Sequence, residues 1–253
     1  MPKIKFSLLS IIGGLTLLSS SAYAEVDAEV SYILNTLLFL IGGFLVMWMA
    51  AGFAMLESGL VTSKSVATIA AKNIGLYSIA GLMFWLVGYN LAYGIPEGGF
   101  IGSFLPWSDA SAVDTGYSDG SDWFFQMVFC ATTCSIVSGT LAERIKIWPF
   151  FLFCAILAGV IYPIEMGWQW GGGHLAAAGF SDFAGSTLVH SAGAAAALAG
   201  ALLLGPRLGR FTDSGEAAPM APFASSSIPL ATLGVFILWM GWFGFNGGSQ
   251  LAM

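Results

Sequence analysis

Hydrophobic positions along this chain are gathered into six long runs, and short segments rich in charged residues, glycine and proline separate them. A helix crosses a bilayer with about 20 consecutive apolar residues, and each run has roughly this length. The pattern predicts membrane-spanning helices near residues 30–56, 73–94, 123–141, 147–164, 184–204 and 226–249. Glycine and alanine recur within the runs, as in helices that pack closely inside a membrane. We expect an all-α, polytopic transmembrane helix bundle.

A seventh, shorter apolar stretch stands at the N-terminus. It follows Lys3 and Lys5, covers Leu8 to Leu18, and ends in Ala22-Tyr23-Ala24. A basic start, a short apolar core and a small-x-small ending are typical of a secretory signal peptide, although an uncleaved first span has a similar composition. We predict a signal peptide over residues 1–24 and a transmembrane domain over residues 25–253.

Composition and charge agree with this interpretation. Hydrophobic residues make up 57% of the chain and charged residues 9%, whereas soluble domains carry about 25% charged residues. After residue 24, every basic residue follows the first, third or fifth run: Lys64, Lys72, Arg144, Lys146, Arg207 and Arg210. Because positively charged loops stay in the cytoplasm, we predict a multi-pass protein of the cell (inner) membrane with an extracytoplasmic N-terminus.

The three cysteines, Cys130, Cys134 and Cys154, lie in apolar runs with no histidine or cysteine partner at metal-ligand spacing. We expect buried, inert thiols, and we expect no metal and no cofactor.

His190 is the first candidate for chemistry, because it is the only histidine in any of the six runs. An ionisable side chain within a membrane span is costly and usually marks a substrate or proton pathway; a packed core histidine is the simpler alternative. Asp182 precedes the same run and is suited to cap its N-terminus. Its charge would secondarily favour cations at that end.

Aromatic residues supply the other candidates. Phe125 and Phe129 are four residues apart, so they share a helix face, which more often serves packing than function. Trp170 stands beside three glycines; it suits an interface anchor but also a partner for a cation. Phe245 and Ser249 are again one turn apart.

Depth orders these residues. Ser249 and Trp170 should lie outermost, Phe245 one turn below, and Phe129 and His190 about 10 Å below the surface. Such an order would let a small cation be held at an indole and a hydroxyl, lose its water at phenyl rings, and then meet an imidazole.

Four segments also resemble the ammonium transporter (Amt/Mep/Rh) family. They are Gly139-Thr-Leu-Ala-Glu-Arg144, Trp170-Gly-Gly-Gly173, Asp182-Phe-Ala-Gly-Ser186 and Gly241-Trp-Phe-Gly-Phe-Asn-Gly-Gly-Ser249. The resemblance implies an external ammonium recruitment site at Trp170 and Ser249 with Phe125 at its edge. It implies a stacked phenyl gate of Phe129 and Phe245, and it makes His190 the first of two paired pore histidines. Asp182 resembles the acidic residue that shapes the recruitment site without touching the ion.

The resemblance implies further properties. Family members have eleven spans in two inverted halves, and their pore lies between the halves. This chain should correspond to the first half plus the first helix of the second, ending at Met253 before the second pore histidine. We therefore expect no complete pore from these residues alone. Expected partners are ammonium, methylammonium, the lipid bilayer, two further copies in a homotrimer and a cytoplasmic PII-type regulator. The expected role is nitrogen uptake.

Three other functions are alternatives for this sequence. An Rh-type channel for neutral ammonia or carbon dioxide would lack the aromatic recruitment site that Trp170 and Ser249 suggest. A membrane ammonium sensor would carry a signalling domain after its last span. An intramembrane hydrolase would need Ser191, His190 and Asp182 as a triad, but adjacent helical residues point about 100° apart and cannot form the required hydrogen bond.

The charge pattern generates a test of orientation. Cysteines introduced by Ser111→Cys and Ser214→Cys fall on opposite predicted sides of the membrane, so a membrane-impermeant thiol reagent added to intact cells should label only the first. Labelling of the Ser214→Cys variant alone would reverse the topology. N-terminal sequencing of the purified protein tests cleavage, because a product that begins at Met1 would exclude it.

Overall fold

The computed structural model describes residues 26–212, 214–220 and 223–252. The predicted signal peptide, residues 1–24, lies outside the described residues. Within these ranges the chain forms helices and loops, with one isolated antiparallel bridge between Phe211 and Ala217.

Six helical segments are long and apolar enough to cross a membrane, as the hydrophobic runs predicted. The first is α2 (Ala28–Leu60), the third α5 (Asp119–Leu141) and the sixth α10 (Ile228–Gly248). The other three each contain a π-helical turn. The second joins α3 (Val66–Met83) to α4 (Tyr89–Tyr93), the fourth joins α6 (Ile147–Ile156) to α7 (Tyr162–Gly167), and the fifth leads through Ser186–Ser191 into α9 (Ala192–Leu204). A short helix, α8 (His174–Ala177), follows the fourth span.

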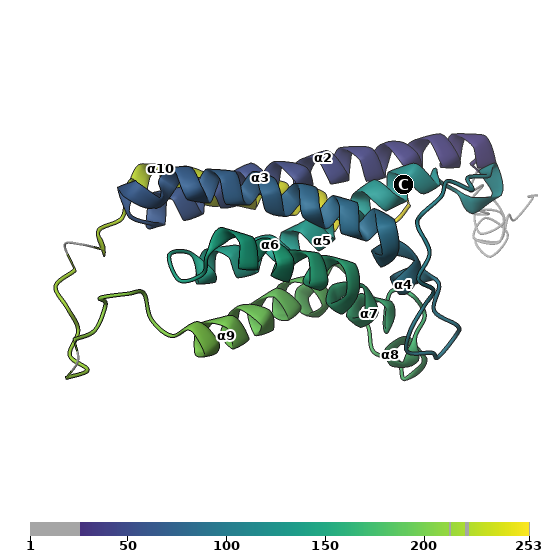
Figure 1. The fold of residues 1–253 in the computed structure, drawn as a ribbon. Helices are drawn as coiled ribbons and strands as arrows, with labels where there is room; N and C mark the ends of the chain where they lie inside the picture. Colours follow the sequence, from purple (N-terminus) through teal and green to yellow (C-terminus); the bar gives the residue numbers. More distant parts are fainter. Residues whose placement is uncertain (1–25, 213, 221–222, 253) are drawn as a thin grey trace, which may run out of the picture.

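Helix α5 forms the centre of the bundle. Its membrane-spanning window is 78% buried, far more than that of any other span, and it packs against α2, α3 and α9. Figure 1 shows α2, α3 and α10 along one side of the bundle, α9 on the opposite side, and α5 and α6 between them. All three cysteines are buried, as predicted.

Glycines bring α10 into close contact with α2. A Cβ added to Gly234 would stand 2.5 Å from the backbone nitrogen of Leu56, and one added to Gly244 would overlap the side chain of Leu45. These distances leave no room for a side chain, so the glycine face of α10 is the face that packs on α2. The opposite face of α10 stays open, with Trp239 and Phe243 exposed.

The loop between α4 and α5 is tied to the bundle around Trp107. The backbone nitrogen of Trp107 donates to the carbonyl of Trp85 over 2.8 Å, and its ring lies 5.5 Å from that of Trp123. The amide of Asn90 donates to the carbonyls of Leu105 and Pro106. The loop is thereby held over the end of the bundle where α8 lies, hereafter the α8 end (Figure 1).

Lys72 is placed differently from the sequence expectation. It was assigned to the segment between the first two runs, but the second span begins at Ser63 and encloses it. Its side chain is buried, its ammonium lies 3.1 Å from a carboxylate oxygen of Glu57, and it donates to the carbonyl of Ser138 over 2.7 Å. The same Glu57 oxygen accepts from the Ser138 hydroxyl. This ion pair joins α2, α3 and α5 inside the bundle.

A second polar cluster lies at the opposite end of the bundle from α8. The carboxylate of Glu143 accepts hydrogen bonds from Thr62 and Ser65 and pairs with Arg207 at 2.7 Å. Partial burial opposes its ionisation, but the hydrogen bonds from Thr62 and Ser65 and the Arg207 charge outweigh burial, so the pKa of Glu143 is lowered. Three connecting segments are fastened together there.

The buried ion pair generates a stability prediction. Lys72→Met leaves the Glu57 carboxylate buried without its cation, which should cost about 3–5 kcal/mol and lower the midpoint of thermal unfolding in detergent. Lys64→Met, at an exposed lysine, is the matched control and should change little. Glu57→Gln combined with Lys72→Met should recover most of the loss, because no unpaired charge remains. A Lys72→Met variant as stable as the unaltered protein would show that the pair contributes nothing.

Candidate functional site

A cavity of about 330 Å³ opens at the α8 end of the bundle, where α5 begins and α10 ends. We call it the end cavity. Its walls come from the second and third spans, from the segments that precede α5 and follow α7, and from the residues after α10. The lining residues are Tyr89, Tyr93, Tyr117, Asp122, Phe125, Gln126, Phe129, Trp170, Phe183, Ser249 and Leu251. Four of the residues singled out from the sequence, Trp170, Ser249, Phe125 and Phe129, therefore meet in one place.

Trp170 lines the cavity with an indole whose N–H is already used. The turn after α7 brings it there, since its backbone nitrogen donates to the carbonyl of Met166. Gly171 permits this turn because any Cβ would collide with the carbonyl of Ala92. The indole nitrogen donates to the backbone carbonyl of Asp182 over 2.7 Å. What Trp170 offers to the cavity is the face of its ring.

Ser249 follows the last residue of α10 and is 8% exposed. Its hydroxyl donates to the carbonyl of Phe245 over 2.8 Å, one turn earlier. A hydroxyl that donates its single proton keeps its oxygen as an acceptor. Ser249 therefore offers an acceptor to the cavity.

Phenyl rings close the inner side of the end cavity. The rings of Phe129 and Phe245 are stacked with centroids 3.7 Å apart and planes 9° from parallel. Phe125 lies 4.6 Å from Phe129 and stacks on Phe39. All three phenyl rings singled out from the sequence are about 1% exposed, so this layer is closed to solvent.

The layer corrects the order of depth expected from the sequence. Phe129 was expected about level with His190 and below Phe245, but Phe129 and Phe245 lie side by side. The expected depths followed the positions of the Cα atoms along each helix. Long aromatic side chains tilt along the helix axis, so their rings need not lie at the level of their Cα atoms.

His190 lies directly behind this layer. Its ring centroid is 5.4 Å from that of Phe245, and it stacks on Trp242 at 5.5 Å. Its Nδ1 atom is 3.1 Å from the carbonyl oxygen of Gly185. A carbonyl only accepts hydrogen bonds, so Nδ1 carries the proton and Nε2 presents a lone pair when the ring is neutral.

Asp182 organises the start of the fifth span. Its Oδ1 accepts from the backbone nitrogens of Gly185 and Ser186, and its Oδ2 accepts from those of Thr187 and Leu188. Gly185 takes a left-handed conformation with φ of 90° between the carboxylate and the helix, a conformation that favours glycine. The capping expected from the sequence is present, and the carboxylate points into the backbone.

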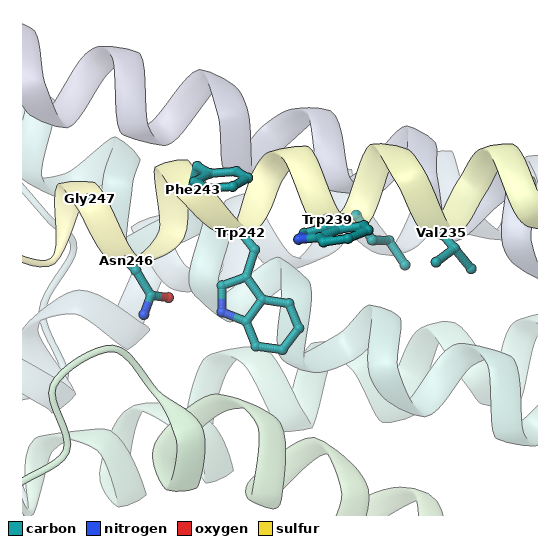
Figure 2. A pocket seen from close by; sticks show the side chains of 7 residues that line it. Val235, Trp239, Trp242, Phe243, Asn246 and Gly247 are labelled. Atoms are coloured by element: carbon teal, nitrogen blue, oxygen red, sulfur yellow. The ribbon is translucent and has the colours of Figure 1, made fainter.

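A larger apolar groove of about 860 Å³ runs along the exposed face of α10. Figure 2 shows Trp239 and Trp242 projecting from this face, with Asn246 near its end. Because His190 stacks on Trp242, the imidazole lies beside the groove as well as behind the phenyl layer.

Several residues of the end cavity were not singled out from the sequence. Tyr89 donates its hydroxyl to Oδ2 of Asp122 over 2.6 Å, and the amide of Gln126 donates to Oδ1 over 3.2 Å. The spacing of Asp122 and Gln126, four residues apart beside Phe125, was a usable signal. The hydrogen bond from Tyr89 joins two different helices, and no spacing in the sequence signals it. His174, the other histidine of the chain, stacks on Phe100 at 4.2 Å.

The described residues contain no group of three or more histidine, cysteine, aspartate or glutamate side chains that could hold a metal ion.

Comparisons with known proteins identify the family of this chain. Residues 37–253 match the model of the Ammonium Transporter Family. A putative ammonium transporter from Synechocystis is 43% identical over 89% of this chain and 51% of its own length. The ammonium transporter Amt2 of Archaeoglobus fulgidus is 42% identical over 84% of this chain and 47% of its own length. The chain spans about half the length of the curated relatives it matches.

Solved structures show the same fold. A protein described as a Sensor Amt Protein superposes with a TM-score of 0.79 at 38% identity, covering 87% of this chain and 55% of that one. Candida albicans Mep2 superposes with a TM-score of 0.75 at 26% identity, covering 90% of this chain and 51% of its own. The similarity is to transporters rather than to enzymes, so the triad of Ser191, His190 and Asp182 has no support. With six membrane-spanning helices and a family match over most of its length, this multi-pass membrane protein belongs to the ammonium transporter family.

Proposed function

We propose that this chain carries the entry side of an ammonium pathway, with recruitment of NH₄⁺ in the end cavity between Trp170 and Ser249. One observation carries the proposal: the polar hydrogens of both residues are spent on backbone carbonyls. The cavity is therefore offered an indole face and a hydroxyl oxygen. A π-face attracts cations, and an oxygen lone pair accepts an N–H, so the pair suits a small cation that donates hydrogen bonds.

Phe129 and Phe245 act as the gate in this proposal, and Phe125 borders the recruitment site. The two stacked rings separate the cavity from His190. A hydrated ammonium ion finds no hydrogen-bond partner among phenyl rings, and an isolated charge there is very costly. Neutral NH₃ therefore passes the rings more easily than NH₄⁺. It forms when NH₄⁺ transfers one proton to an acceptor of the relay.

His190 receives the substrate behind the gate. With Nδ1 held by the Gly185 carbonyl, Nε2 is the ring atom that can accept a hydrogen bond or a proton. We propose that a second imidazole, from the remaining part of the transporter fold, pairs with His190 and completes the relay. Transport would then proceed as NH₃ plus a relayed proton, and Asp182 would act indirectly by holding the segment that carries Trp170 and Gly185.

The open groove on α10 is the surface on which that remaining part would pack. The relatives are about twice as long as this chain, and the pore of an inverted-repeat transporter lies between its halves. We further propose a homotrimer in the inner membrane with the N-terminus outside, transport of methylammonium as well as ammonium, and control by a PII-type protein on the cytoplasmic side.

A sensor is the second candidate function. The similarity to the structure described as a Sensor Amt Protein favours it. A sensor would share the end cavity but need not conduct at an appreciable rate, so measured transport separates the two. An Rh-type channel for neutral gases is disfavoured by the indole face and acceptor oxygen of the cavity.

The recruitment site generates a binding prediction. Trp170→Leu combined with Ser249→Ala, in the intact protein reconstituted into liposomes, should raise the half-saturating ammonium concentration about tenfold to a few tens of times. The cation–π contribution is about 0.5–2 kcal/mol and the acceptor oxygen adds to it. Some conduction should remain. Trp148→Leu, at an exposed tryptophan on α6, is the control. If the double variant keeps the half-saturating concentration of the unaltered protein, ammonium is not recruited at these residues.

The relay generates a selectivity prediction. His190→Ala should abolish most ammonium transport, whereas His190→Glu should leave a folded assembly that discriminates poorly between ammonium and potassium. The reason is that a carboxylate retains polarity but attracts both cations. Currents in proteoliposomes measure this, with size exclusion as the check on assembly and His174→Ala as the control at the other histidine. Normal rate and selectivity in His190→Ala would make the imidazole a packing residue.

A further inference from the structure

We propose that the end cavity contains a second, charged contact for the incoming cation, formed by the carboxylate of Asp122 and held in place by Tyr89 and Gln126. This rests on the proposed function, because it assumes that ammonium enters through this cavity. It adds an anionic group to a site otherwise made of an indole face and a hydroxyl.

Asp122 stands in the first turn of α5 and lines the cavity although it is only 6% exposed. Both of its oxygens have fixed partners. Oδ2 accepts from the Tyr89 hydroxyl at 2.6 Å, and Oδ1 accepts from Nε2 of Gln126 at 3.2 Å. The carboxylate is therefore oriented from α4 and from the next turn of its own helix.

The carboxylate has no resident counterion. Among the described residues the ion pairs join Lys72 to Glu57 and Arg207 to Glu143, and neither includes Asp122. The negative charge of Asp119, in the first turn of the same helix, also acts on it unfavourably. A nearly buried carboxylate without a cation is costly, and a cation that enters the cavity relieves that cost.

Asp182 provides the contrast that argues against a merely structural role. Asp182 spends both oxygens on four backbone N–H groups at a helix start. Asp122 also lies at a helix start, but the hydrogen bonds to its carboxylate come from the Tyr89 and Gln126 side chains, which line the cavity. One acid caps a helix, whereas the other belongs to the cavity wall.

Gln126 adds an unused acceptor. Its NH₂ group must face the carboxylate, since its carbonyl could not donate there. This fixes the amide orientation and leaves Oε1 buried with no hydrogen-bond partner among the described residues. A buried acceptor without a donor is unfavourable, so a donor-rich ligand is favoured beside it.

Most of the donors that line the cavity are already used. The hydroxyls of Tyr89 and Ser249, the indole N–H of Trp170 and one N–H of Gln126 each serve a protein acceptor. Tyr93 and Tyr117 add further aromatic surface to the wall. A cation with several N–H groups satisfies such a site better than a cation with none, and anions are repelled. Asp122 thus contributes both affinity and preference for ammonium over potassium.

The test is transport of radiolabelled methylammonium by the intact protein in liposomes. Asp122→Asn keeps the size of the side chain and removes its charge. It should raise the half-saturating concentration about tenfold, the scale of a hydrogen bond to a charged group, with the maximal rate changed less than about twofold. Tyr89→Phe keeps the ring and frees the carboxylate, so it should give a smaller rise of about threefold. Inhibition by potassium should strengthen in Asp122→Asn.

Asp114→Asn is the matched control. It removes an exposed carboxylate from the connection that precedes α5, and it should leave half-saturation within about twofold. An equal rise in this control would mean that any nearby negative charge suffices, which would overturn the proposal. If Asp122→Asn fails to fold by size exclusion, Tyr89→Phe decides, and unchanged half-saturation there would equally overturn it.

The outcomes also separate this proposal from the proposed function. If Asp122→Asn has unaltered half-saturation while Trp170→Leu with Ser249→Ala weakens it, Asp122 is structural and recruitment stands. If Asp122→Asn lowers only the maximal rate, the carboxylate is no binding contact and the proposal is wrong. If neither Asp122→Asn nor the double variant changes half-saturation, ammonium does not bind in the end cavity and both proposals fall.

Discussion

The carboxylate of Asp182 is the interaction on which the candidate site depends. A helix that starts inside a membrane protein exposes N–H groups that no water can satisfy, and this one side chain accepts four of them. The backbone carbonyl of Asp182 fixes Trp170, and the carbonyl of Gly185, held at the same turn, fixes His190. One capping arrangement thereby positions an aromatic wall and an imidazole from opposite sides of the phenyl layer.

The polar groups of the bundle are distributed so that its two ends differ in character. The α8 end contains acceptors, aromatic faces and the unpaired carboxylate of Asp122. The opposite end contains the ion pair of Glu143 and Arg207. Between them, Lys72 and Glu57 form a buried pair that joins three helices. Of these three clusters, the one at the α8 end contains a carboxylate without a basic partner.

Helix α10 shows how small residues decide which surface is core and which is interface. Gly234 and Gly244 bring its backbone against α2, so its bulky side chains point the other way. Trp239 and Trp242 stand exposed in a groove, and Trp242 contacts His190. On a membrane-spanning helix such an apolar face is covered either by lipid or by another helix. Its position beside the imidazole is consistent with a pathway that runs between two parts of a larger fold.

The sequence by itself determined the six spans and their approximate ends, because hydropathy and helical period are local properties. It also singled out four residues that the end cavity brings together: Trp170, Ser249, Phe125 and Phe129. Only the tertiary structure placed Lys72 inside the bundle and paired Tyr89 with Asp122. It also placed the stacked rings of Phe129 and Phe245 at one depth, where the turns of their helices had put Phe129 lower. These arrangements join helices far apart in the chain, and side-chain packing between helices leaves no periodic trace in the sequence.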